Sequence, residues 1–342
     1  MELLLTKNPI VESIGLRSTK DLVVKHINQA TGFNIATGFI TNDSIAELQS
    51  IVAFKKNSMT LNLFIGMNYL NGFTQVQYNA VAKLNEMLHN IGVGKIYLST
   101  KVLFHGKMYS FWNQSSCLGS FVGSSNLGSF LDKKSSYIES DIYFAGKEGI
   151  GINSNISKII DCLGHEFDKV PVITQFKKPE IKVLKGYDYV TEVPSEQIKS
   201  YKAMRTGVIA HVPFKTDPKS NLNAYFGAGK VKNKYSPRGW YEVEIILNKG
   251  SEAAILLPMR ESFTVITDDG FRFNLSRQGD YYKNLRSDSN LKILGRWIKG
   301  RMENEGALEI GKPITKDTIA RFGKSQMVFE ETENGIWLFS MK

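Results

Sequence analysis

The sequence predicts an α/β domain followed by a mostly β domain, and three observations lead to this expectation. The chain has 342 residues, which is long enough for two separate hydrophobic cores. Strand-type and helix-type patterns alternate over the first half, whereas short strands separated by turns dominate the second. A stretch with two prolines and five charged residues, 171–185, lies where the pattern changes. We therefore expect a first domain at 1–175, a linker at 176–190 and a second domain at 191–342.

The first half alternates apolar strands with helices whose apolar residues recur at helical spacing. Asn42 and Asp43 are expected to cap one helix, and Thr74 is expected to cap a longer one. The expected strands are 33–40, 61–67, 95–98, 104–112, 118–122 and 142–144, and the expected helices are 21–30, 42–54, 74–89 and 155–168.

The second half contains short apolar or alternating segments between turn residues. Asp268-Asp269-Gly270 predicts a hairpin between two of them. Thr315 and Gly323 are expected to begin and end a short helix. A small barrel with two helices fits this pattern best. The expected strands are 208–212, 241–247, 253–257, 263–266, 271–275, 327–331 and 336–340, and the expected helices are 291–302 and 316–322.

Composition excludes several classes of protein. Hydrophobic residues make up 42% of the chain and charged residues 22%, as in ordinary globular domains. No apolar run approaches the length of a membrane span, and the N-terminus does not read as a signal peptide. The two cysteines, Cys117 and Cys162, have no metal-type spacing and suit a reducing compartment. We therefore expect a cytoplasmic protein with no membrane partner, no metal and no cofactor.

Positive charge is concentrated in the second half. Residues 1–175 hold 15 Lys/Arg against 13 Asp/Glu, whereas residues 176–342 hold 28 against 20. Within residues 199–238 the count is nine to one, and aromatic residues, asparagines and glycines are interleaved with the cations. A basic run is often only a solvated face. This composition is better suited to following phosphates and reaching base edges, so it favours nucleic acid as the partner.

One short segment gathers the residue types needed to cleave a phosphodiester. It contains His105-Gly106-Lys107, then Gly123-Ser124-Ser125-Asn126, then Glu139. An imidazole can attack phosphorus, and an ammonium group with hydroxyl and amide donors can hold the phosphate oxygens. His105 and Lys107 are two residues apart, so on a strand both would project from one face. A His-x-Lys pair alone is a weak signal, and the turn and the carboxylate strengthen it.

This set resembles the phospholipase D superfamily, whose motif reads H-x-K, then G-S-x-N, then a downstream acidic residue. The match covers roughly residues 104–144. The chain departs from the full motif at Trp112, where an aspartate would fall. This loss is better tolerated by the nuclease branch than by lipid-hydrolysing members. The resemblance implies an α/β phospholipase D-like nuclease domain.

The residue types then suggest a role for each group. His105 would attack phosphorus and form a covalent phosphohistidine. Lys107 would place positive charge at the non-bridging oxygens, and Ser124 and Asn126 would donate further hydrogen bonds. Glu139 would orient the imidazole and stabilise its cationic form.

The superfamily uses two H-x-K motifs in each active site, one histidine as the nucleophile and the other as the acid for the leaving oxygen. This chain has one such motif, so we expect a homodimer through the nuclease domain, with an interface around Gly123–Phe130. The remaining histidines are expected to be structural or on the surface. They are His26, His89, His165 and His211.

The second half also resembles a known family. The matching segments are Phe263–Gly270, Ile293–Arg296 before a helix, Ile314-Thr315 and Arg321–Gly323. They resemble the C-terminal half of restriction endonucleases of the NgoFVII/NgoAVII type, which join a phospholipase D-like nuclease to a pseudobarrel DNA-binding domain related to that of plant transcription factors.

The resemblance implies a type II-like restriction endonuclease of a restriction-modification system, which cleaves double-stranded DNA at a specific sequence without metal. Some relatives work beside a helicase-like ATPase subunit. This chain has no Walker-type motif of its own, so any use of ATP would belong to that separate subunit.

Two segments are the best candidates for reading DNA, the long basic loop 215–239 and the region 272–286. Arginine pairs well with guanine and glutamine with adenine in the major groove. Arg272 ranks lower, because it could be a surface residue of a strand. The candidates are Lys215, Lys219, Asn221, Asn223, Lys230, Lys232, Lys234, Arg238, Arg272, Arg277, Gln278, Asp280, Lys283 and Arg286.

Two alternatives remain open. A phospholipase or other phosphoester transferase would require the missing aspartate, a second H-x-K motif and an interfacial apolar surface, none of which the sequence shows. A DNA-binding scaffold or regulator with an inactive nuclease domain is harder to exclude. The intact set of His105, Lys107, Asn126 and Glu139 argues against it.

Overall fold

The computed structural model describes residues 1–6, 13–128, 138–218, 220–223 and 238–342. The chain divides into two compact units, one built from Met1–Pro179 and one that takes up most of the chain from Glu180 to Lys342. The change from one unit to the other falls within the segment expected as a linker. Among the described residues, no helix has the length and apolar character needed to cross a membrane.

The first unit is built on an eight-stranded sheet in the order β1-β7-β6-β5-β2-β3-β4-β8. Strands β2, β3 and β4 are parallel, and the others pair antiparallel with their neighbours. The strands are β1 (Glu2–Leu5), β2 (Gly32–Thr37), β3 (Thr60–Ile65), β4 (Gly94–Ser99), β5 (Lys107–Asn113), β6 (Ser116–Gly123), β7 (Ser140–Ala145) and β8 (Gly164–Glu166).

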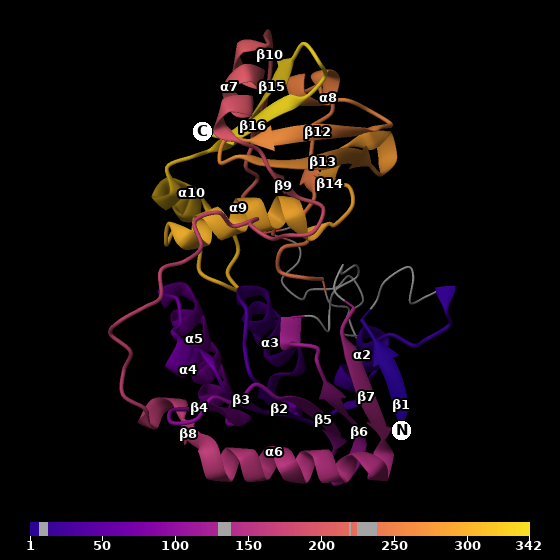
Figure 1. Ribbon diagram of the computed structural model, residues 1–342, viewed down its shortest axis with the longest axis vertical. Helices are drawn as coiled ribbons and strands as arrows, with labels where there is room; N and C mark the ends of the chain where they lie inside the picture. The colour runs from indigo at the N-terminus through magenta and orange to yellow at the C-terminus, as the bar shows by residue number, and fades with distance from the viewer. Residues whose placement is uncertain (7–12, 129–137, 219, 224–237) are drawn as a thin grey trace. The chain divides into compact units, whose positions relative to one another are not determined.

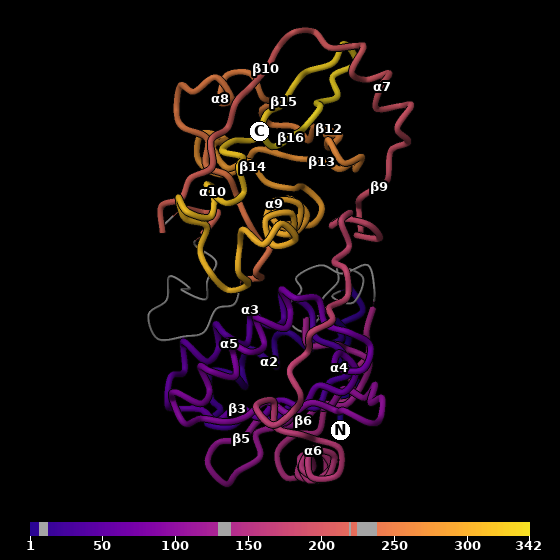
Figure 2. Tube along the Cα trace, turned by 90° about the vertical axis from the view of Figure 1, so that its left-hand side faces the viewer, coloured from indigo at the N-terminus to yellow at the C-terminus, as the bar shows by residue number. Residues whose placement is uncertain are grey.

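Helices cover both faces of this sheet (Figure 1). Helix α6 lies along one face, where its buried Ile156 belongs to a cluster with Ala36 and Phe64. Helices α2, α3 and α5 lie on the other face, and α3 and α5 run side by side (Figure 2), joined by a bond from Gln49 to the Ala80 carbonyl. The helices are α2 (Thr19–Gln29), α3 (Asn42–Lys55), α4 (Asn68–Asn71), α5 (Gln75–Ile91) and α6 (Ile150–Leu163).

The helix ends show which local signals decide the structure. Thr74 caps α5 through a capping box, as the sequence predicts. The cap of α3 is Thr41, and the predicted cap Asn42 is the first helical residue. The expected helix 155–168 is shifted, because α6 ends at Leu163. Residues 164–166 pair with Tyr97–Ser99 of β4, and this pairing overrides their helical pattern.

The second unit is built on another eight-stranded sheet, in the order β10-β15-β16-β12-β13-β14-β11, with β9 paired to β13. Its strands are β9 (Thr191–Glu192), β10 (Arg205–Pro213), β11 (Ile245–Ile246), β12 (Ser262–Thr267), β13 (Phe271–Gln278), β14 (Asn284–Ser287), β15 (Gln326–Thr332) and β16 (Trp337–Met341). Its helices are α7 (Ser195–Ala203), α8 (Glu252–Leu256), α9 (Lys292–Asn304) and α10 (Lys316–Phe322).

Most predicted strands of this unit are present, and two predictions are wrong. The predicted strand 253–257 is helix α8, because Ser251 caps it by accepting from the Ala254 amide. The predicted strand 241–247 is reduced to Ile245–Ile246. Trp240 and Tyr241, at its start, instead turn to helix α9, where both donate to the buried carboxylate of Glu303.

Candidate functional site

The His-x-Lys pair lies where the loop before β5 meets the ends of the central strands. His105 is an exposed loop residue, and β5 begins only at Lys107. The expectation that both project from one face of a strand is therefore wrong. Lys107 is 6% exposed, and its ammonium group turns back toward His105. The Lys107 Nζ donates to the His105 carbonyl at 2.9 Å and lies 3.3 Å from each imidazole nitrogen.

Two glycines leave the space that the backbone of this loop occupies. A Cβ atom at Gly38 would lie 3.0 Å from the His105 Cα, and one at Gly66 would lie 2.2 Å from the Phe104 carbonyl oxygen. The amide of Phe104 donates to the Gly66 carbonyl at 3.2 Å. Each glycine directly follows a strand, β2 or β3. At Gly66 only glycine permits so close an approach, whereas a side chain at Gly38 would crowd His105. Both glycines fall inside the expected strands 33–40 and 61–67, and their role becomes visible only because β2 and β3 end at Thr37 and Ile65.

An aromatic ring also borders the exposed histidine. The ring centroids of Phe39 and His105 are 5.6 Å apart, in an edge-to-face arrangement. Phe39 follows Gly38 directly, so the turn after β2 supplies both the space for the loop and a wall for the imidazole.

The Gly123–Asn126 turn is fastened to β7 by its two serines. The Ser124 amide donates to the Ser140 carbonyl at 3.0 Å, and the Ser124 hydroxyl accepts from the Ser140 amide at 3.0 Å. Ser125 is completely buried, and its hydroxyl donates to Asp141 at 2.6 Å. Ser124 therefore already has a structural partner, although it remains exposed.

Asp141 is a buried carboxylate that the sequence analysis did not identify. It is 1% exposed and accepts hydrogen bonds from Thr19 and from the amide and hydroxyl of Ser125. Burial raises the pKa of Asp141, and the three hydrogen bonds oppose this shift. Tyr109 of β5 donates to the Ser125 carbonyl at 2.8 Å. These contacts fix the turn relative to the strand that begins with Lys107.

The two remaining motif residues are Asn126 and Glu139, which lie in the chain next to Ser125 and Ser140. The Asn126 Oδ1 is buried and has no hydrogen-bond partner among the described residues. The backbone of Glu139 is bonded in both directions to Thr6. Burial lowers the pKa of Lys107, and the negative charge of Glu139 opposes this shift, so the carboxylate acts on the ammonium group. Within the described part of the chain, Glu139 makes no hydrogen bond to His105.

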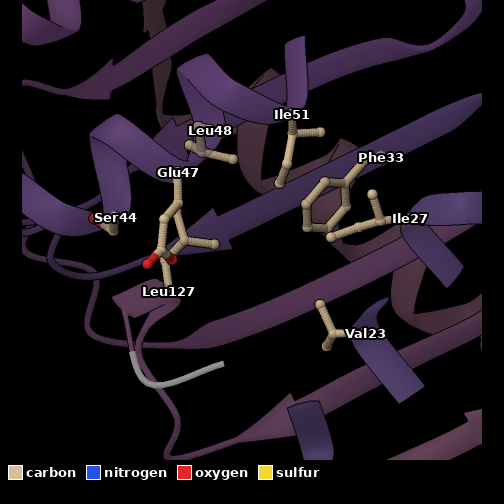
Figure 3. A pocket seen from close by; sticks show the side chains of 8 residues that line it. All are labelled: Val23, Ile27, Phe33, Ser44, Glu47, Leu48, Ile51 and Leu127. Carbon is tan, nitrogen blue, oxygen red and sulfur yellow. The ribbon is translucent and has the colours of Figure 1, made fainter. Parts of the chain in front are cut away.

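Leu127, the residue after the motif, anchors the turn in the core. It is 5% exposed and lines a small pocket between α2 and α3 that contains none of the motif residues (Figure 3). The pocket lining consists of Val23, Ile27, Phe33, Ser44, Glu47, Leu48, Ile51 and Leu127. This pocket is part of the packing that supports the turn.

The segments expected to read DNA are called here the first arm, residues 215–239, and the second arm, residues 272–286. In the first arm Lys215 donates to Asn248 at 2.8 Å, and Arg238 is exposed. Asn223 has a structural role instead, because it is 3% exposed and exchanges two 2.8 Å hydrogen bonds with the backbone of Ile314. Lys219, Lys230, Lys232 and Lys234 lie outside the described residues.

The second arm contains one further correction. Arg277 is 3% exposed, and its guanidinium donates to the backbone carbonyls of Ala254, Leu257 and Tyr282. It therefore holds the chain together and cannot reach DNA in this conformation. The exposed candidates of this arm are Arg272, Gln278, Asp280 and Lys283, and Arg286 is half-buried.

The described residues contain no group of three or more side chains suited to hold a metal ion. The candidate site is thus a histidine and a lysine in contact, an asparagine without a partner for its buried oxygen, and a carboxylate beside the lysine. Such a set can attack a phosphodiester and stabilise its negative charge.

Comparisons with known proteins identify both halves. Residues 18–151 match the family model of the NgoFVII restriction endonuclease N-terminal PLD domain. Residues 201–333 match that of the NgoFVII C-terminal B3-like DNA-binding domain. A search of curated proteins gives no match.

The solved structures with similar folds are distant in sequence. The phospholipase D family member Nuc from Salmonella typhimurium is 18% identical, with 48% of this chain and 97% of that chain covered and a TM-score of 0.30. Polyphosphate kinase from Porphyromonas gingivalis is 11% identical, with 51% and 26% covered and a TM-score of 0.29.

Proposed function

The chain belongs to the NgoFVII family of restriction endonucleases and is a site-specific deoxyribonuclease, and on this premise we propose how it cleaves DNA. The reaction is hydrolysis of a phosphodiester through a covalent phosphohistidine, without a metal ion, at an active site shared by two copies of the chain. The observation that carries this proposal is the contact between Lys107 and His105, with the ammonium nitrogen 3.3 Å from both ring nitrogens. A phosphate that approaches the imidazole therefore also meets a positive charge.

The first step forms one bond and breaks another. A ring nitrogen of His105 bonds to phosphorus, the phosphorus–oxygen bond to one DNA strand breaks, and the leaving oxygen takes a proton from the His105 of the second copy. Lys107 and the Asn126 amide stabilise the negative charge on the non-bridging oxygens. In this proposal the Asn126 amide nitrogen donates to one of these oxygens.

The second step returns the enzyme to its starting state. The second histidine takes a proton from water, the resulting hydroxide attacks phosphorus, and the bond to His105 breaks. Each imidazole carries a positive charge during part of this cycle. Glu139 supplies balancing negative charge in this proposal, and its charge already acts on the neighbouring Lys107 ammonium group, whose pKa it raises against the effect of burial.

DNA recognition is assigned to the second unit and its two arms. The candidates of the second unit that remain accessible or half-buried are Lys215, Asn221, Arg272, Gln278, Asp280, Lys283 and Arg286, and the exposed Arg238 is counted with the first unit. A helicase-like ATPase companion, as in some relatives, would supply translocation but none of the catalytic groups.

Plasmid DNA incubated with the purified protein in EDTA, with and without an ATPase companion, tests the proposal. Cleavage should persist in EDTA, since no step uses a metal. His105→Ala and Lys107→Ala should abolish cleavage and leave DNA affinity nearly unchanged. His89→Ala, at an exposed position of α5, is the matched control and should cleave normally. A covalent protein–DNA adduct should form with the parent protein and not with His105→Ala. Strict dependence on magnesium would contradict the phosphohistidine mechanism.

A further inference from the structure

The carboxylate of Glu244, in the second unit, accepts hydrogen bonds from residues of both arms. Glu244 accepts from the Asn221 amide of the first arm at 3.2 Å. It also accepts from the Asn284 amide at 3.4 Å and from the Arg286 guanidinium at 3.2 Å, both in the second arm. It stands out chemically, because a carboxylate on a phosphate-binding surface repels its ligand unless it has another task.

The strand pairing places these side chains on one face of the sheet. Glu244 directly precedes β11, which pairs with β14 through Ile245↔Leu285. Asn284 and Arg286 flank the fully buried Leu285, so both project from the opposite face. Gln278 lies across the ladder from Asn284 and is exposed, which places its amide on that same face.

The contacts with Glu244 leave part of each partner unused. Arg286 gives one terminal nitrogen to Glu244, and its buried Nε has no hydrogen-bond partner. Asn284 gives its amide nitrogen, and its buried Oδ1 has no partner either. The side chains of Arg286 and Glu244 are 32% and 19% exposed. The two unpaired atoms are buried, so the part of Arg286 that remains accessible is the end of its guanidinium group, which the contact with Glu244 holds in place.

An arginine whose guanidinium group has a fixed orientation recognises a base edge better than a mobile arginine does. Bidentate pairing with guanine needs the planar fork in a defined orientation, and binding costs less entropy when that orientation already exists. A carboxylate bonded to the guanidinium provides such an orientation, because the charged pair is directional.

We propose that Glu244 is a positioning residue for sequence recognition, which joins the two arms and orients Arg286 toward a base edge in the major groove. This inference rests on the proposed function of the second unit as the part that reads DNA. Glu244 itself makes no contact with a base. It acts through Arg286, Asn284 and Asn221.

The test uses the full chain carrying His105→Ala, so that binding is measured without cleavage. The protein is incubated with a pool of randomised DNA duplexes, and the enriched sequence is compared with a scrambled duplex by fluorescence anisotropy. Glu244→Gln keeps the size of the side chain and removes its charge. It should lower discrimination between the two duplexes about tenfold or more, the effect of losing one oriented base contact. Affinity for the scrambled duplex should stay the same or rise, because a negative charge has been removed.

Glu330→Gln is the matched control. Glu330 of β15 also pairs with an arginine, Arg205, and it is 14% exposed, but it belongs to neither arm. Its substitution should leave discrimination unchanged. Asn221→Ala supplies a second variant that does not alter the carboxylate. If Glu244 joins the arms, Asn221→Ala should weaken discrimination by a smaller factor in the Glu244→Gln background than in the parent.

Three outcomes would overturn the inference. An equal rise in affinity for both duplexes would mean that Glu244 only repels phosphate. An equal loss for both, with a lower melting temperature, would mean that it only stabilises the fold. Additive effects of Asn221→Ala and Glu244→Gln would mean that the arms are not coupled. Failure of the parent protein to enrich any sequence would instead overturn the proposed function itself.

Discussion

At the scale of single residues, His26 is a titratable side chain buried in the core of the nuclease unit. It is 4% exposed and stacks on Phe111 at a centroid distance of 5.4 Å. Its Nε2 lies 3.0 Å from the Tyr143 hydroxyl, and its Nδ1 is buried without a partner. Burial, aided by the nearby charges of Lys25 and Arg17, lowers the pKa of His26 to about 4. The imidazole is therefore neutral in the folded protein near neutral pH.

This buried histidine makes stability depend on pH. Because its pKa in the folded state lies below the ordinary histidine value of 6.5, its contribution is complete above about pH 6.5 and is lost as the pH falls toward 4. The loss amounts to at most about 3 kcal/mol, at 1.36 kcal/mol for each pKa unit. His26→Phe should flatten the decline of melting temperature between pH 6.5 and 4, and the exposed His89→Phe should not. An equally steep decline in His26→Phe would assign the acid sensitivity to other groups.

Residue types alone could predict part of the site. The residue types and their spacing in the sequence are enough to propose the candidate set of His105, Lys107, Asn126 and Glu139. Asn223 and Arg277 are of equally suitable types, but both bond to backbone carbonyls in the interior. An arginine that supports a loop and one that reads a base are identical in sequence. Asp141 was missed for the converse reason, since a buried carboxylate is recognised only by its partners.

At the scale of elements, the ends of β2 and β3 form the platform for the histidine loop. The close approach of the Phe104 carbonyl to Gly66 leaves no space for a side chain. Gly66→Ala should therefore displace the loop and lower the cleavage rate about 100-fold, the cost expected when reacting groups move by about 1 Å. DNA binding should not change, because the second unit is not altered.

Single-turnover cleavage and duplex affinity, measured on the same preparation, check this expectation. Gly151→Ala is the control, since a Cβ at this position of α6 meets nothing within 4 Å. It should cleave normally and be slightly more stable, because alanine favours a helix over glycine. A normal rate for Gly66→Ala would mean that the loop is positioned by other contacts.

Elements with local signals at both ends were predictable from the sequence. Helix α10 has the predicted bounds, with Thr315 as its cap and Gly323 in the left-handed conformation that ends it. Short elements that depend on distant partners were not predictable. Strand β14 has four residues and is defined by its pairing with β13 and β11. Its pattern alone does not distinguish it from a loop.

At the scale of the whole molecule, the two-part organisation was clear from the sequence, since pattern and charge change at the same place. The nuclease fold and the mostly β DNA-binding fold are confirmed by the two family matches. The assembly of two chains remains a prediction. It follows from the chemistry, because one histidine cannot serve as nucleophile and as leaving-group acid in the same step.

Mixing experiments test the shared active site. Parent protein and His105→Ala protein are allowed to exchange subunits at a constant total concentration, and initial cleavage rates are measured. If two copies form each site, activity should fall as the square of the parent fraction, because mixed dimers cannot complete the reaction. Mixing with His89→Ala should cause no fall. A linear decrease with His105→Ala would show that each chain works alone.

The pairing of β1 with β7 has a consequence for the order in which the nuclease unit folds. Thr6 is bonded to Glu139 and Thr19 to Asp141, pairs separated by 133 and 122 positions along the chain. Strand β1 can therefore pair only after β7, more than 130 positions later in the chain, has been synthesised. A nascent chain that has exposed His105 and Lys107 still lacks the contacts that lock the Gly123–Asn126 turn. Cleavage activity should therefore appear only after the whole unit has folded, and not while the chain is incomplete.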